Sequence, residues 1–480
     1  MDIQTMTAAE LLERYRNRSL SPVEVTDELF KYIREWNPIL NAFVTLNEEE
    51  AREQAKRAEA RYRRGENPLP LEGVPVAIKD LTNTKGLRTT YGTPLYKDHV
   101  PGRDATVVQR LKAAGAIIMG KTNTPEFGYK ATTDNPLFGA TRNPWNPETN
   151  AGGSSGGSAA AVSAGFVPLA EGSDGGGSIR IPAALCGVFG FKPSYGRIPY
   201  DNHLNGIFGT HEPFLHYGTL TRSVRDAALM FDVMKGEAAT DPFSLPDSGW
   251  SAFKALDVEI DRSLKIGWTL DFGMYEIDHE VARVFQDAID ALADDGWDIQ
   301  VVELRFGKTL REYIEFFERL WTVGLAAGCK EEADAHPEAF SKSFLEMVER
   351  GTRLTAVEFK RLEEDRAAFW HIMQGIFSEY DIFISPTVAV PAFHWSWEGP
   401  PAINGKPIKA DSDWVMTQIY NLTGHPAISI PIGLTKDGLP VGLQAASGRL
   451  QDEKLLRFAY MYEQRFATLA GRVANRMMTP

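Results

Sequence analysis

The sequence contains little cysteine, no long apolar run and no cluster of unbalanced positive charge. Only two of its 480 residues are cysteines, Cys186 and Cys329, and their spacing fits neither a zinc site nor a redox motif. Two cysteines cannot form a disulfide framework, so we interpret both as buried apolar residues. No stretch of about 18 apolar residues occurs, and the N-terminal residues lack the pattern of a signal peptide. We therefore expect a cytoplasmic protein that is not associated with a membrane.

The charge balance is acidic. Lysine and arginine number 51 against 64 aspartates and glutamates, which gives a formal net charge of −13. Such a chain lacks the positive potential that a nucleic-acid or anionic membrane surface requires. The basic cluster from Arg61 to Arg64 follows five glutamates on the same predicted helix, a pattern typical of a solvated helix face. We expect small-molecule partners, no nucleic acid, and a monomer or homodimer.

Short apolar runs alternate with helical patterns from residue 74 onward. Hydrophobic residues make up 43% of the chain, enough for a sizeable core. The apolar runs end in polar or glycine turns and cover residues 74–78, 116–119, 188–191, 264–268, 299–303, 382–385 and 427–432. Helical patterns such as 106–114 and 281–293 lie between several of them. This alternation predicts an α/β fold with a mixed, largely parallel twisted sheet, covered by helices on both faces.

We expect one structural domain overall, built from three regions. Residues 1–70 form an N-terminal helical segment, in which Thr7 with Glu10 and Ser21 with Glu24 fit the capping-box spacing. Residues 71–235 and 380–480 form the α/β core. Residues 236–379, with helical patterns at 310–321, 337–350 and 356–377, form a helical elaboration that shapes the substrate pocket.

Two glycine- and serine-rich segments stand out, at 152–158 and 172–178. A flexible linker would have this composition. However, a linker is not expected in the middle of a domain, or twice within so short an interval. A phosphate-binding loop is a second possibility, but neither segment continues into Gly-Lys-Ser/Thr or forms Gly-x-Gly-x-x-Gly after a strand. We interpret Ser178 as a nucleophile framed by glycines. The backbone amides of Gly175, Gly176, Gly177 and Ser178 are then candidates for an oxyanion hole.

A serine nucleophile needs a base. The sequence has nine histidines, at positions 99, 203, 211, 216, 279, 336, 371, 394 and 425, and none lies in a recognisable Ser-His-Asp context. Lysine can serve if burial lowers its pKa. Lys79 directly follows a predicted buried strand, where it would lose solvation. The alternative is that Lys79 forms a salt bridge with Asp80 at the edge of the sheet.

Several motifs closely resemble those of the amidase signature family. They are Val76-Ala77-Ile78-Lys79-Asp80, Gly153-Ser154-Ser155-Gly156-Gly157 and Gly176-Gly177-Ser178-Ile179-Arg180-Ile181-Pro182-Ala183, with further likeness at 120–127, 142–146, 191–194, 385–387, 422–427 and 438–444. Ser154 precedes Ser178 by 24 residues, which is the spacing of that family and selects Ser154 over Ser155. Ser173 and Gly175 depart from the residues that are commoner in the family.

The resemblance implies a Ser-Ser-Lys relay. In this relay, neutral Lys79 accepts a proton from Ser154, and Ser154 takes the proton of Ser178, which attacks the substrate carbonyl. The resemblance also implies that a cis peptide bond holds Ser154. Asp174 and Arg180 flank the nucleophile, and we interpret them as an ion pair that fixes the loop. Lys121 and Lys192 are competing bases by position. No metal or cofactor is expected.

The resemblance also implies the activity. We expect a stand-alone amidase that hydrolyses carboxamides, aryl amides or anilides through an acyl-enzyme on Ser178. Some members of the family also hydrolyse carbamates or esters. The alternative is the glutaminase subunit of a tRNA-dependent amidotransferase. Aromatic residues are frequent between Phe316 and Trp397, and Phe316, Phe317 and Trp321 are the candidate pocket residues. Such a pocket favours an apolar or aryl substrate.

Overall fold

A single large sheet forms the centre of the computed structural model, which describes residues 2–201, 214–247, 249–466 and 469. Within this part of the chain the sheet has 11 strands in the order β1-β3-β2-β6-β8-β7-β14-β15-β11-β9-β10. Its strands are β1 (Phe43–Leu46), β2 (Pro75–Lys79), β3 (Ile117–Thr122), β6 (Leu169–Asp174), β7 (Phe189–Lys192), β8 (His216–Thr221), β9 (Lys265–Trp268), β10 (Asp298–Val301), β11 (Ile382–Pro386), β14 (Ala427–Leu434) and β15 (Pro440–Ser447). Two small ribbons pair β4 (Arg142–Asn143) with β5 (Asn146–Asn150) and β12 (Ala402–Ile403) with β13 (Lys406–Pro407).

The sheet is mixed, as predicted, but it is not largely parallel. Among the described strands, β2 pairs in parallel with β3 and β6, and β9 with β10 and β11. The other six pairings are antiparallel. The physical reason is the connections: β14 and β15 are joined by a short turn, which only antiparallel neighbours allow. The prediction of predominantly parallel strands was therefore wrong.

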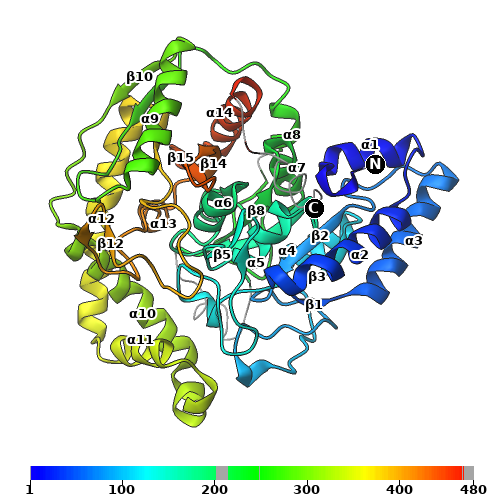
Figure 1. Cartoon of the computed structure of the whole chain (residues 1–480), viewed down its shortest axis with the longest axis horizontal. Helices are drawn as coiled ribbons and strands as arrows, with labels where there is room; N and C mark the ends of the chain where they lie inside the picture. Colours follow the sequence, from blue (N-terminus) through cyan, green and yellow to red (C-terminus); the bar gives the residue numbers. More distant parts are fainter. Residues whose placement is uncertain (1, 202–213, 248, 467–468, 470–480) are drawn as a thin grey trace.

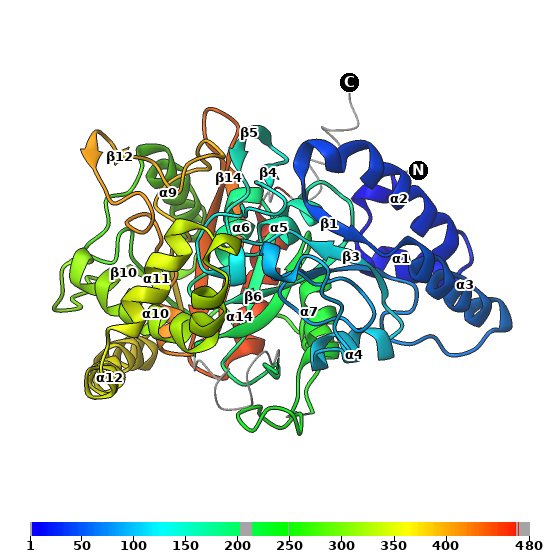
Figure 2. The ribbon, with the colours of Figure 1, turned by 90° about the horizontal axis from the view of Figure 1, so that it is seen from below.

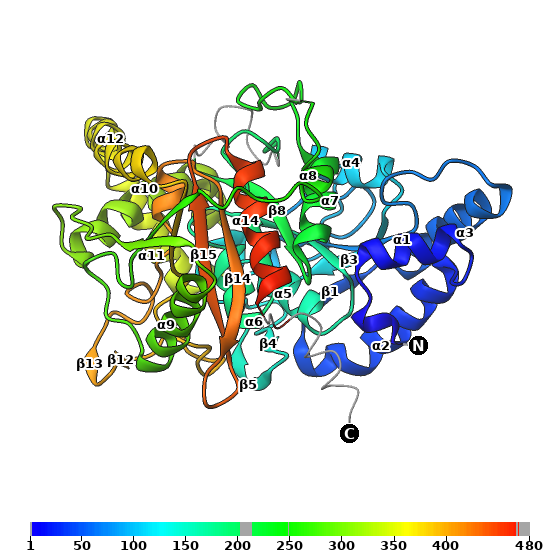
Figure 3. The ribbon, with the colours of Figure 1, turned by 90° about the horizontal axis from the view of Figure 1, so that it is seen from above.

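Helices cover both faces of the sheet, as predicted (Figures 1, 2 and 3). They are α1 (Ala8–Arg16), α2 (Pro22–Leu40), α3 (Glu48–Arg64), α4 (Thr106–Ala113), α5 (Gly156–Ser163), α6 (Arg180–Cys186), α7 (Val224–Met234), α8 (Ala252–Ala255), α9 (His279–Asp294), α10 (Leu310–Ala335), α11 (Lys342–Thr352), α12 (Ala356–Glu379), α13 (Ile419–Leu422) and α14 (Asp452–Arg465). Helices α5 and α6, which follow the two glycine- and serine-rich segments, lie toward the viewer in Figure 2, whereas α7 and α14 lie toward the viewer in Figure 3. The site described below lies on the side of α5 and α6.

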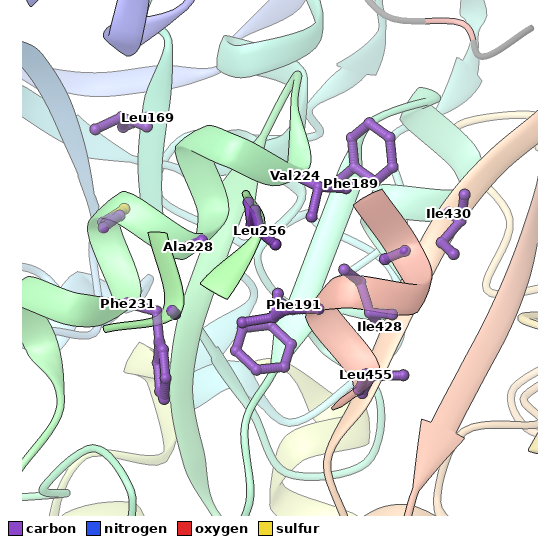
Figure 4. Packing of buried hydrophobic residues seen from close by; sticks show 14 of the residues in the cluster. Leu169, Phe189, Phe191, Val224, Ala228, Phe231, Leu256, Ile428, Ile430 and Leu455 are labelled. Atoms are coloured by element: carbon purple, nitrogen blue, oxygen red, sulfur yellow. The ribbon is translucent and has the colours of Figure 1, made fainter. Parts of the chain in front are cut away.

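The core follows the two-residue alternation of the strands. Phe189 and Phe191 of β7 and Ile428 and Ile430 of β14 pack with α7 and α14 (Figure 4). The intervening Gly190 points to the opposite face, where a Cβ atom would lie 2.5 Å from the Ala183 side chain of α6. Because successive side chains of a strand point to opposite faces, β7 contributes to the core on one face and packs against α6 on the other.

The N-terminal helices begin as the sequence predicted. Thr7 caps α1 in a capping box with Glu10, and Ser21 caps α2 in the same way with Glu24. Each box satisfies two backbone amides that the first helical turn leaves unpaired. Helices α1, α2 and α3 lie together at the β1 end of the sheet (Figure 1).

Residues 236–379 contribute more than helices. They supply β9 and β10 to the sheet as well as α10, α11 and α12. The helix predicted at 337–350 is divided into a short 3-10 turn, Pro337–Ala339, and α11. The reason is Ser341, whose backbone is extended and whose hydroxyl accepts a hydrogen bond from the amide of Phe344, so that α11 begins there.

Candidate active site

Two neighbouring strands bring Lys79 and the serine loop together. Strands β2 and β6 are parallel, with Val76 opposite Leu169 and Ala77 opposite Ala170. β2 ends at Lys79, and β6 ends at Asp174, directly before the glycine loop that carries Ser178. Because parallel neighbours end at the same edge of a sheet, the lysine and this loop emerge side by side.

Ser154 lies beside Lys79, in the loop between β5 and α5. The Nζ atom of Lys79 donates a hydrogen bond to Ser154 Oγ at 2.7 Å and another to Ser173 Oγ at 3.0 Å. The Gly153–Ser154 peptide bond is cis, as the family resemblance implied. A Cβ atom on Gly153 would lie 2.5 Å from the backbone oxygen of Thr132, so the close approach of two backbones requires glycine there.

Lys79 is fully buried, at 0% exposure. Burial lowers the pKa of its ammonium group to about 7, although nearby Glu171 and Asp174 oppose the shift. Glu171 is also buried, and its carboxylate accepts hydrogen bonds from the Lys79 amide at 2.9 Å and the Thr82 hydroxyl at 3.0 Å. Desolvation raises the pKa of Glu171. The position therefore has the property that a lysine base needs near neutral pH, which is a substantial neutral fraction.

Ser178 is the most accessible of the three residues, at 9% exposure. No hydrogen bond joins its hydroxyl to that of Ser154 in the described residues; instead the Ser178 carbonyl accepts from the Ser155 amide at 3.0 Å. Within the same residues, the backbone amides of Gly175, Gly176 and Ser178 have no protein acceptor. Three donors beside one hydroxyl form an arrangement that can bind an oxyanion.

Gly177 does not belong to that set. Its amide donates to Asp174 Oδ1 at 2.7 Å, so the prediction that Gly177 contributes to an oxyanion hole was wrong. The reason is local: the side chain of Asp174 turns back into its own loop and accepts the Gly177 amide together with that of Ile179, at 3.2 Å.

Asp174 and Arg180 form the predicted ion pair, and both side chains are fully buried. Arg180 Nε and Nη2 each lie 2.9 Å from a different carboxylate oxygen of Asp174. Burial alone would raise the pKa of Asp174, but the Arg180 guanidinium outweighs it and holds that pKa well below its usual range. Arg180 Nη1 also donates to Gln444 Oε1 at 2.6 Å, and Nη2 to Asn421 Oδ1 at 2.6 Å. The pair thus ties the serine loop to α13 and β15.

Lys121 and Lys192, the two competing candidate bases, form hydrogen bonds with other groups. Lys121 Nζ bonds the hydroxyls of Thr84 and Thr89, both at 3.1 Å, and the carbonyl of Thr82. Burial lowers the pKa of Lys121 to about 8. Lys192 Nζ donates to the His425 carbonyl at 2.6 Å. Neither amine forms a hydrogen bond with Ser154 or Ser178 in the described part of the chain.

Two further alternatives from the sequence are not supported. Lys79 forms no ion pair with Asp80 within the described residues, because the Asp80 carboxylate accepts from Thr90 instead. No histidine described by the structure forms a hydrogen bond with Ser178. His203 and His211 lie outside the described residues.

Ser178 and Gly176 open onto a cavity of about 280 Å³. Phe317 and Trp321 of α10 line it, as predicted, together with Ile181, Ile314 and Val415. Phe316 does not line it: its ring packs 5.1 Å from that of Phe369 in the apolar core. Phe316 and Phe317 point about 100° apart on α10, and the Phe316 ring packs against α12 instead of lining the cavity.

Comparison with known proteins identifies the family. The sequence model of the family described as Amidase matches residues 24–456. The chain belongs to the amidase family. An acylamidase of Rhodococcus erythropolis is 36% identical, over 96% of this chain and 96% of that protein. A glutamyl-tRNA(Gln) amidotransferase subunit of Geobacillus thermodenitrificans is 34% identical, over 97% of this chain and 98% of that one. The crystal structure of a bacterial aryl acylamidase of the amidase signature family superposes with a TM-score of 0.91 at 31% identity, covering 99% of each chain.

Membership confirms the resemblance found in the sequence and makes this amidase a hydrolase of amide carbon–nitrogen bonds. In the residues that the structure describes, His, Cys, Asp and Glu form no group of three or more placed to hold a metal ion. None of the helices described combines the length and apolar character needed to span a bilayer. Both cysteines are buried and free.

Several residues near the site were given no role in the sequence analysis. Glu171 and Ser173 lie on β6, whose sequence Leu-Ala-Glu-Gly-Ser-Asp has no apolar run to mark it as a buried strand. Gln418 and Asn421 come from α13 and the residue before it, more than 230 residues after the serine loop. Glu171 could have been recognised as a neighbour of Lys79 only if β6 had first been predicted as a buried strand.

Proposed function

We propose that this amidase acts alone on small neutral amides, by way of an acyl-enzyme on Ser178. The observation that carries the proposal is the 2.7 Å hydrogen bond from a buried lysine with a lowered pKa to Ser154, at a cavity that Ser178 lines. Neutral Lys79 accepts the proton of Ser154, and Ser154 accepts that of Ser178 as the latter attacks the carbonyl carbon. The relay closes when the hydroxyls of Ser154 and Ser178 approach to hydrogen-bond distance in the substrate complex.

The later steps use the same groups. The amides of Gly175, Gly176 and Ser178 stabilise the negative charge on the carbonyl oxygen. The proton then returns from Ser154 to the leaving nitrogen, the C–N bond breaks, and the acyl group remains on Ser178 Oγ. Water attacks the ester, with the relay again taking the proton, and releases the carboxylic acid.

The cations around the cavity argue against a substrate that carries a free carboxylate. Lys130 and Arg350 are the two cations that the described lining contains. Lys130 lies 2.8 Å from Asp134, and Arg350 lies 2.7 Å from Glu318. Because each cation already has a carboxylate partner, a substrate carboxylate would have to displace it. With Phe317 and Trp321 as walls, the cavity suits an anilide, another aryl amide or a carbamate better than a free amino acid.

The pH dependence of this amidase tests the base. Lys79 must be neutral to accept a proton, and its pKa is lowered to about 7. We therefore expect kcat/KM to rise with pH through neutrality, with a midpoint near 7, and to level off on the alkaline side. Steady-state kinetics between about pH 5 and about pH 9 measure the profile. A midpoint at the ordinary lysine value of about 10 would contradict the assignment of Lys79.

The second candidate is the glutaminase subunit of a tRNA-dependent amidotransferase, which the 34% identical relative favours. A p-nitroanilide assay and a glutaminase assay, run side by side on the purified chain, separate the two. We expect turnover of the anilide and little release of ammonia from glutamine, because the lining offers no unpaired cation in its described residues. Glutaminase activity that appears only with partner subunits, without anilide turnover, would reject the stand-alone function.

A further inference from the structure

One wall of the cavity holds a side-chain amide that the protein itself does not use. Gln418 lines the cavity together with Ser178 and Gly176. It is 5% exposed, and its Oε1 atom is buried without a hydrogen-bond partner in the described residues. A buried polar atom without a partner destabilises a folded chain. A ligand in the cavity that donates a hydrogen bond to Gln418 Oε1 would remove this cost.

The position of Gln418 is fixed by its neighbours. The preceding Thr417 donates its hydroxyl to the Gly176 carbonyl at 2.5 Å, and its own carbonyl accepts from Arg180 at 2.9 Å. The Gln418 carbonyl accepts the amides of Asn421 and Leu422, both at 3.0 Å, at the start of α13. The Cγ atom of Gln418 lies 3.7 Å from the place that a Cβ atom on Gly176 would occupy. The backbone of Gln418 is therefore held beside the loop that presents the candidate oxyanion-binding amides.

A second residue of the cavity lining, Trp321, also has an unpaired polar atom. The Nε1 atom of Trp321 is buried and has no partner in the described residues. A Cβ atom on Gly175 would lie 2.6 Å from the Trp321 ring, so glycine at 175 makes room for the indole. Gly175 and Gly176 thus each have a side chain with an unused hydrogen-bonding group beside them. Two such groups at one cavity favour a polar ligand over a purely apolar one.

We propose that the Gln418 carboxamide binds the scissile amide group of the substrate, its Oε1 atom accepting the N–H of that amide. This inference rests on the proposed function. The contact fixes the plane of the amide relative to Ser178 Oγ, which aligns the carbonyl carbon for attack. An ester of the same shape has an oxygen in place of the N–H and cannot make the contact. Gln418 is therefore a positioning residue that makes the enzyme prefer secondary amides to esters.

The test compares two substrates that differ only at this atom, p-nitroacetanilide and p-nitrophenyl acetate. Gln418→Met keeps the length of the side chain and removes its hydrogen bonds. We expect the ratio of kcat/KM for the amide to that for the ester to fall about 10- to 100-fold. The melting temperature should stay the same or rise, because the variant no longer buries an unpaired oxygen. Gln418→Glu keeps an oxygen acceptor and should retain more of the ratio than Gln418→Met.

The matched control is Gln374→Met. The carboxamide of Gln374 lies 3.0 Å from His425 Nε2 and does not line the cavity, so the amide-to-ester ratio should not change. An equal loss on both substrates in Gln418→Met, or an unchanged ratio, would overturn the role of Gln418. A wild-type chain that hydrolyses neither substrate would instead overturn the proposed function, and this inference with it.

Discussion

Replacement of Lys79, Ser154 or Ser178 by alanine is expected to lower kcat by roughly three to six powers of ten while the chain remains folded. In the proposed relay the three residues act in series: Lys79, which contacts Ser154, takes the proton of Ser154, and Ser154 takes that of Ser178. Loss of any one member stops the proton transfer, so a double variant should be little worse than a single one. Steady-state kinetics with a p-nitroanilide, together with melting temperatures, measure both expectations.

Ser155→Ala is the matched control for Ser154→Ala. The two serines are adjacent and both are buried, but the Ser155 hydroxyl donates to the Ser173 carbonyl at 3.2 Å and forms no hydrogen bond with Lys79 in the described residues. Loss of one such neutral hydrogen bond costs about 1 kcal/mol, which should leave turnover close to that of the wild type. Near wild-type activity in Ser178→Ala would show that the nucleophile is another residue.

Among the substitutions proposed for this protein, Arg180→Met is expected to lower the stability most, because it removes the ion-pair partner of the fully buried Asp174. Removal of one partner of a buried ion pair lowers the free energy of unfolding by about 3–5 kcal/mol. Turnover should fall as well, since the pair holds the loop of Gly177 and Ser178 through the Gly177 amide. Urea unfolding followed by circular dichroism measures the first effect, and anilide turnover the second.

An exposed pair in the same chain provides the comparison. Arg283 lies 3.1 Å from Glu280 on α9, with 43% of the arginine side chain exposed. Surface ion pairs contribute at most about 1 kcal/mol, so Arg283→Met should unfold almost like the wild type. If Arg180→Met were as stable as Arg283→Met, the buried pair would not be what fixes the serine loop.

Much of this protein could be predicted from the sequence because the signals are local. A capping box needs four consecutive residues, and those beginning at Thr7 and Ser21 form as predicted. The glycines before Ser178 and the apolar strand before Lys79 are also local, and they mark these residues wherever they lie in the fold. Among the strands that were missed, β6 lacks such a signal: it is buried and central, yet it carries glutamate, glycine, serine and aspartate.

From the sequence alone we could predict Ser178, the glycines before it and Lys79 as a candidate site, because each is recognisable within a few residues. How these residues are arranged became visible only in the folded chain. It placed Lys79 rather than Lys121 beside Ser154, and it engaged the Gly177 amide with Asp174. It also turned Phe317 toward the cavity and Phe316 away, and brought Gln418 to the serine loop. The Gly177–Asp174 bond spans only three residues, but the other features depend on contacts between residues far apart in the chain, which local spacing does not encode.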